Sequence, residues 1–120
     1  MENKIIINGE EYIKKSDVVT MAEGVDGMAY VIVRTYSAGV HAGYLKERNG
    51  KEVVLLNTRR LWKWAGAFTL SEIALNGVSK PDECKFSCEI PEITLTEAIE
   101  IITCTEKAKN IILGVKAYEC

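Results

Sequence analysis

The sequence has little of what most catalytic and metal sites require. It contains one histidine, and its four cysteines form no C-x-x-C pair, so a zinc site of the usual spacing is not predicted. The motifs G-x-x-x-x-G-K-[ST], G-x-G-x-x-G, H-E-x-x-H and G-x-S-x-G, which mark phosphate, dinucleotide, zinc and nucleophile sites, are all absent. We therefore expect neither an enzyme of a standard class nor a bound cofactor.

Signals for a membrane or for secretion are also missing. The chain has no apolar run of about 18 residues, the length that begins to span a bilayer. Residues 1–13 lack the basic start, apolar middle and small-residue cleavage site of a signal peptide. We therefore expect a cytoplasmic protein that does not contact membranes. In that compartment Cys84, Cys88, Cys104 and Cys120 are expected to be reduced thiols.

The positive charge is concentrated in the middle of the chain. Residues 29–64 carry seven lysines and arginines against two acidic residues, whereas the whole protein has a net charge of −2. All four arginines, Arg34, Arg48, Arg59 and Arg60, lie in this middle part. A basic unit within an acidic protein favours a compact anion as partner over a long polyanion such as duplex DNA.

The pattern of β-prone runs predicts an α+β protein in which β-structure dominates. Residues 1–120 are expected to form a single domain, in which 1–28 are an N-terminal hairpin and connector and 29–120 are the core. Asn-Gly pairs at 8–9 and 49–50 are strong hairpin signals. We expect strands at 30–36, 40–47, 51–64, 85–90, 93–95, 98–103 and 115–118, and two short helices at 70–75 and 105–114.

Glycine inside the second predicted core strand indicates how the strands are arranged. Ala42 and Gly43 lie in the middle of residues 40–47, and an internal glycine often marks a bulge, a barrel bend or a close backbone approach by a ligand. Together with a long third strand, this predicts a small curved antiparallel sheet or an SH3/Sm-like barrel.

The richest segment for chemistry is residues 59–64, Arg-Arg-Leu-Trp-Lys-Trp. In a strand, Arg60, Trp62 and Trp64 share one face and Arg59 lies on the other. A guanidinium binds phosphate through paired hydrogen bonds, and an indole stacks on a nucleobase. This combination predicts a nucleotide or nucleic-acid ligand. The alternative is a pair of core tryptophans flanked by cations that reach the solvent.

Four further side chains of the basic middle are candidate ligand contacts. Tyr36 and Ser37 lie in a predicted turn whose phenol, hydroxyl and backbone amides suit a phosphate or a base edge, and Arg34 precedes them. His41 is a candidate contact to phosphate or base. A general base at His41 and an ordinary packing role remain the alternatives.

Two segments resemble a known family. The segment Y-V-I-V-R-T-Y-S-A-G-V-H-A-G at 30–43 and the segment R-R-L-W-K-W-A-G-A at 59–67 resemble a widespread family of small phage proteins of unknown function, over about residues 29–118. This family in turn resembles phage anti-CBASS sponges, which are oligomers that sequester 3′,3′-cyclic GMP-AMP so that the host effector is not activated. The resemblance implies a homo-oligomer, a dimer or tetramer, in the cytoplasm of an infected bacterium.

The resemblance implies that the protein sequesters a cyclic di- or oligonucleotide without cleaving it. Arg59 or Arg60 would pair with phosphate, Trp62 or Trp64 would stack on a base, and Tyr36, Ser37 and His41 would add polar contacts. One alternative is a module that binds single-stranded nucleic acid or RNA with the same residue types. The other is a structural or interaction protein of the phage whose tryptophans pack a subunit interface.

Overall fold

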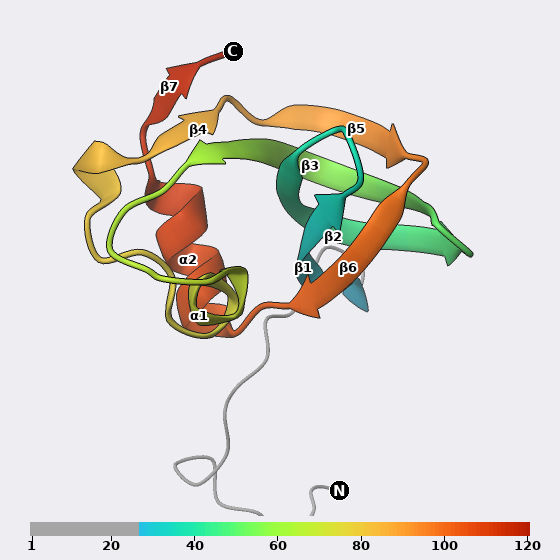
Figure 1. The fold of residues 1–120 in the computed structure, drawn as a ribbon, viewed down its shortest axis with the longest axis horizontal. Helices are drawn as coiled ribbons and strands as arrows, with labels where there is room; N and C mark the ends of the chain where they lie inside the picture. Colours follow the sequence, from blue (N-terminus) through green and yellow to red (C-terminus); the bar gives the residue numbers. More distant parts are fainter. Residues whose placement is uncertain (1–26) are drawn as a thin grey trace, which may run out of the picture.

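The computed structural model describes residues 27–120, drawn in colour in Figure 1. The predicted N-terminal hairpin and most of its connector lie outside the described residues. The strands are β1 (Tyr30–Thr35), β2 (Val40–Asn49), β3 (Glu52–Lys63), β4 (Lys85–Ser87), β5 (Ile90–Leu95), β6 (Ala98–Thr103) and β7 (Ala117–Glu119). The helices are α1 (Leu70–Asn76), the short 3-10 turn Pro81–Glu83, and α2 (Glu106–Gly114).

The strands form one curved sheet that is not closed into a barrel. Its order is β6-β1-β2-β3-β4-β7, and β5 pairs with the first part of β3. The long strand β3 carries the curvature, because it pairs with β2 and β5 along most of its length and with β4 at its end. The β-dominant α+β class and the curved sheet are confirmed, with one difference. The sheet is mixed, because β7 pairs in parallel with β4.

Both helices lie together on one side of β3 (Figure 1). The Thr69 hydroxyl caps α1, and the Thr105 hydroxyl accepts the amide of Ala108 to cap α2, as expected for threonine at this position. The same Thr105 hydroxyl donates to the carbonyl of Leu75 over 2.7 Å. One residue thus starts α2 and joins it to the end of α1.

Each face of β1 contributes to a different part of the core. Tyr30 and Ile32 join the cluster beneath the helices, which includes Phe86, Ile73 and Ile112. The alternating residues enter a second cluster with side chains of β3, β5 and β6: Val31, Val33, Val53, Leu55, Leu95 and Ala98. Side chains from strands that are not neighbours meet in this second cluster, because the sheet bends around it.

Gly43 allows the close approach of β2 and β3. A Cβ atom at this position would lie 2.9 Å from the Thr58 Cβ and 3.0 Å from the Leu56 carbonyl oxygen. The strand register also shifts between Ala42 and Tyr44. The bulge, one of the features predicted for this glycine, is therefore present, and the close approach is by the neighbouring strand β3.

The strand after Pro81–Glu83 differs from the prediction. β4 ends at Ser87, and Pro91 lies inside β5 instead of interrupting a strand. Proline is tolerated there because β5 pairs only with β3 among the described strands, so its other edge needs no amide donor. The predicted final edge strand is confirmed as β7 (Ala117–Glu119), which starts two residues later and ends one residue later than expected.

The cysteine prediction was wrong for two of the four residues. Cys84 and Cys104 are free and buried, but Cys88 and Cys120 form a disulfide. The parallel pairing of β4 and β7 brings their Cα atoms to 4.8 Å. A pairing between segments 32 residues apart leaves no mark in local sequence patterns.

Candidate ligand-binding site

The end of β3 places arginine and tryptophan side chains as the alternation of a strand requires. Arg60 is exposed and the Trp62 side chain is 70% exposed, whereas Arg59 and Leu61 are buried. Trp64 departs from the prediction, because it is half-buried and packs against the helical cluster. The physical reason is that β3 ends at Lys63, after a register shift between Leu61 and Lys63.

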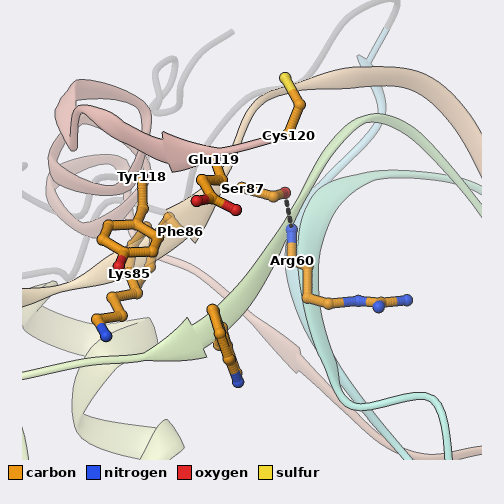
Figure 2. A pocket seen from close by; sticks show the side chains of 8 residues that line it. Arg60, Lys85, Phe86, Ser87, Tyr118, Glu119 and Cys120 are labelled. Carbon is orange, nitrogen blue, oxygen red and sulfur yellow. Dashed lines mark hydrogen bonds between the residues drawn. The ribbon is translucent and has the colours of Figure 1, made fainter.

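Arg60 and Trp62 border a surface cleft of about 260 Å³ between the ends of β3, β4 and β7. Figure 2 shows the side chains that line it. They are Arg60, Trp62, Lys85, Phe86, Ser87, Tyr118, Glu119 and Cys120. Two cations and one carboxylate among the lining side chains give the cleft a positive balance, and Phe86, which also lines it, is buried.

Two exposed aromatic rings flank a lysine in this cleft. The rings of Trp62 and Tyr118 lie 6.2 Å apart, edge to face. The Lys85 ammonium lies 5.6 Å from the centre of the Trp62 ring and 4.7 Å from that of Tyr118. Both distances are within the range of a cation–π contact. Both aromatic residues are exposed, Trp62 to 70% and Tyr118 to 50% of their surface.

Arg60 supplies a second cation with a free guanidinium. Within residues 27–120 this group has no hydrogen bond or ion pair, whereas its backbone amide donates to the Ser87 hydroxyl over 2.8 Å. In Figure 2 the Arg60 side chain points away from Lys85 and Tyr118. The cleft therefore has its lysine beside the two aromatic rings and, at the opposite end, an arginine that is unpaired among residues 27–120.

The structure gives Arg59 a role beneath the cleft and not inside it. Its side chain is 4% exposed. Nε donates to the Ser87 carbonyl and Nη1 to the Ile112 carbonyl, each over 2.7 Å, and the guanidinium lies over the Phe86 ring. Burial lowers the pKa of this guanidinium. Arg59 thus joins β3 to β4 and to the last turn of α2.

His41 is placed in the sheet, away from the lining of the cleft. It is 1% exposed, and its Nε2 lies 2.9 Å from the Ala38 carbonyl, so Nε2 carries the proton and donates it. Burial lowers the pKa of His41, and the nearby positive charge of Arg60 adds to this, although the bond to Ala38 acts in the opposite direction. This geometry matches the packing alternative considered from the sequence.

The lowered pKa of His41 predicts a pH dependence of stability. In the unfolded chain the imidazole binds protons below its ordinary value of 6.5, whereas the folded state resists protonation. The unfolded state therefore holds more protons between the two pKa values, and the free energy of unfolding falls as pH is lowered through this window. Urea denaturation over a pH series is expected to show this slope in the wild type and a reduced slope in His41→Gln. Equal slopes would contradict the assignment.

Tyr36, Ser37 and Arg34 lie on a different surface. Ser37 donates to the Glu97 carboxylate over 3.1 Å, and Arg34 forms an ion pair with Glu100 over 3.1 Å. Tyr36 is exposed and lines a separate hollow with Lys51, Thr96, Glu97 and Ile99. The structure therefore does not bring this group together with the cleft, and acidic neighbours already pair with the side chains of Ser37 and Arg34.

Six of the eight residues that line the cleft were not predicted from the sequence, and two of these, Lys85 and Tyr118, contact Trp62. Lys85 opens the three-residue strand β4 and Tyr118 belongs to the three-residue strand β7. In a three-residue strand the alternation of polar and apolar side chains is too short to be recognised. Only the pairing of β7 with β4 shows that the side chains of Lys85 and Tyr118 meet. A faint signal was available, because Tyr118 lies in the predicted edge strand.

Comparison with protein families decides where the chain belongs. Residues 28–112 match the model of a domain of unknown function, DUF6948, which covers well over half of the chain. The chain belongs to this family. Arg60, Trp62 and Lys85 lie within the matched DUF6948 residues, whereas Tyr118 and Cys120 follow them. Comparisons with curated proteins and with solved structures give no significant match.

Two structural features are absent from residues 27–120. No helix in this part of the chain is long and apolar enough to cross a membrane. In the same residues, no group of three or more histidine, cysteine or acidic side chains is placed to hold a metal ion.

Proposed function

We propose that the cleft at the ends of β3, β4 and β7 binds a compact nucleotide. The observation that carries this proposal is the juxtaposition of the exposed Trp62 and Tyr118 rings with the Lys85 ammonium. The same cleft is also lined by Arg60, whose guanidinium has no partner among residues 27–120. A nucleotide combines a flat apolar base with a phosphate, and the cleft combines flat rings with cations.

Each half of such a ligand has a partner of suitable strength. Stacking on an aromatic side chain contributes about 1 to 3 kcal/mol per base. The planar guanidinium of Arg60 can donate paired hydrogen bonds to a phosphate, and the Lys85 ammonium attracts the phosphate as a point charge. Lys85 occupies the space beside both rings, so a stacking base would displace it, and the released ammonium would remain close enough to pair with the phosphate.

The finer proposal is sequestration without chemical conversion. The cleft lining offers binding groups, and the buried His41 is not part of it. We propose a phage protein that holds a cyclic nucleotide messenger such as 3′,3′-cyclic GMP-AMP in the cytoplasm of the infected bacterium. A homo-oligomer that sets two clefts opposite each other would match the approximate two-fold symmetry of such a ligand. The support is the cleft chemistry and the resemblance of residues 30–43 and 59–67.

A second candidate is binding of single-stranded nucleic acid. The observation in its favour is that Trp62 is 70% exposed on an open surface, as are the stacking platforms of proteins that bind single strands. The two candidates differ in how affinity depends on the ligand. A single-strand binder gains affinity with oligonucleotide length and loses it steeply with salt.

The test is a panel of cyclic di- and trinucleotides, mononucleotides and oligonucleotides of increasing length. Binding is followed by thermal shift, and bound ligand is then released by heat denaturation and analysed by chromatography. We expect a cyclic dinucleotide to bind and to be released intact. Converted ligand would indicate an enzyme, and affinity rising with oligonucleotide length would favour the second candidate. Absence of binding across the panel would point to a structural or interaction protein.

A further inference from the structure

One wall of the cleft belongs to a strand with few attachments. Tyr118, Glu119 and Cys120, which line the cleft, come from β7 and the residue after it. All three residues of β7 are exposed, so the strand buries no side chain. The opposite wall, with Arg60 and Trp62, belongs to β3, which pairs with three other strands.

The contacts that hold β7 are few. Its parallel register with β4 pairs Phe86 with Ala117 and Ser87 with Glu119. The amide of Cys88 donates to the Glu119 carbonyl over 3.2 Å. The Cys88–Cys120 disulfide then closes the end of the strand pair. A three-residue exposed edge strand is at the low end of local stability, so the disulfide is the strongest of these attachments.

We propose that the Cys88–Cys120 disulfide is a redox latch that controls the proposed ligand cleft; this inference rests on the proposed function of that cleft. In the oxidised protein the disulfide holds Tyr118 beside Trp62 and Lys85. A dithiol reductant donates two electrons and two protons, the S–S bond breaks, Cys88 and Cys120 become thiols, and the reductant becomes a disulfide. The end of β7 is then released and the Tyr118 wall separates from β4.

The position of the disulfide allows this exchange. Cys120 is exposed and Cys88 is half-buried, so a reductant in solution can reach the bond. The two remaining cysteines are buried, and burial raises the pKa of the Cys104 thiol to about 12, which keeps it protonated and unreactive. Cytoplasmic disulfides are mostly transient and redox-sensing. In a reducing cytoplasm the latch is open, and an oxidising change closes it.

Reduction affects the two halves of the cleft differently. Arg60, Trp62 and Lys85 stay on β3 and β4, so the cations and one ring remain. Tyr118 is lost, and with it the second aromatic contact of Lys85. The reduced protein therefore keeps its attraction for phosphate but loses part of its base binding.

The first experiment needs no ligand. Hydrogen exchange of the full chain is compared between the oxidised protein and the protein treated with dithiothreitol. We expect exchange of the Cys88 amide and of residues 117–119 to accelerate by about tenfold or more on reduction, while β1 and α2 stay unchanged. The Cys88→Ser/Cys120→Ser variant should exchange like the reduced protein with or without reductant. Because it retains Cys84 and Cys104, it also controls for effects of the reductant elsewhere. Unchanged exchange at β7 would overturn the latch.

The second experiment uses 3′,3′-cyclic GMP-AMP as probe. We expect the oxidised protein to bind it about five- to tenfold more tightly than the reduced protein or the double serine variant, since one ring contact contributes about 1 kcal/mol. Reoxidation should restore the affinity of the wild type only. Equal affinities despite faster exchange at β7 would overturn control of the cleft by the latch. If neither form binds the probe, the proposed function fails for this ligand, and the exchange experiment still decides whether the disulfide holds the wall.

Discussion

Arg59→Ala is expected to lower the free energy of unfolding by about 3 kcal/mol. The change removes a buried guanidinium that donates to the carbonyls of Ser87 and Ile112 and lies over Phe86. Both carbonyls would lose a charged donor, and a cavity would remain among β3, β4 and α2. Urea denaturation measured by circular dichroism gives the magnitude.

The adjacent Arg60→Ala is the matched control for Arg59→Ala. Arg60 has the same side chain one position later, but it is exposed and its guanidinium is unpaired within the described residues. Its replacement is expected to change the free energy of unfolding by no more than about 0.5 kcal/mol. Similar losses in the two variants would mean that Arg59 does not join the three elements as described. Arg59→Lys should recover only part of the stability, because an ammonium does not reproduce the fork that reaches both carbonyls.

Trp62→Ala is expected to weaken nucleotide binding by about ten- to a hundredfold, because stacking on an aromatic ring contributes about 1 to 3 kcal/mol. Its free energy of unfolding should change little, since the residue is 70% exposed and its ring contacts Tyr118 and Lys85 at the surface of the cleft. Isothermal titration calorimetry with the ligand found in the nucleotide panel measures the affinity.

The control for Trp62→Ala is another exposed aromatic residue outside the cleft. Phe68 precedes α1 and is 91% exposed, so Phe68→Ala should leave both affinity and stability unchanged. Trp64→Ala gives the opposite pattern to Trp62→Ala, because Trp64 packs against the helical cluster: stability should fall while affinity is retained. Full affinity in Trp62→Ala would remove this cleft as the binding site.

The sequence by itself determined most of the secondary structure and one face of the site. Asn49-Gly50, the threonines before each helix and Gly77 mark where elements begin and end, because turns and caps depend on backbone conformation within a few residues. Gly43 similarly marked the bulge in β2. Alternation within β3 placed Arg60 and Trp62 together on one face, since that relation needs only the geometry of a strand.

Only the tertiary structure decided which of these side chains are available to a ligand. Alternation separates Arg59 from Arg60, but the docking of β4 and α2 decides that Arg59 is buried. Trp64 packs against the helical cluster because β3 ends before it. His41 is buried because of its position within the sheet. The aromatic partner Tyr118 and the Cys88–Cys120 disulfide both require the parallel pairing of β4 with β7. Such contacts join segments about thirty residues apart, as the 32-residue separation of the disulfide shows, and their energy comes from packing that no local pattern encodes.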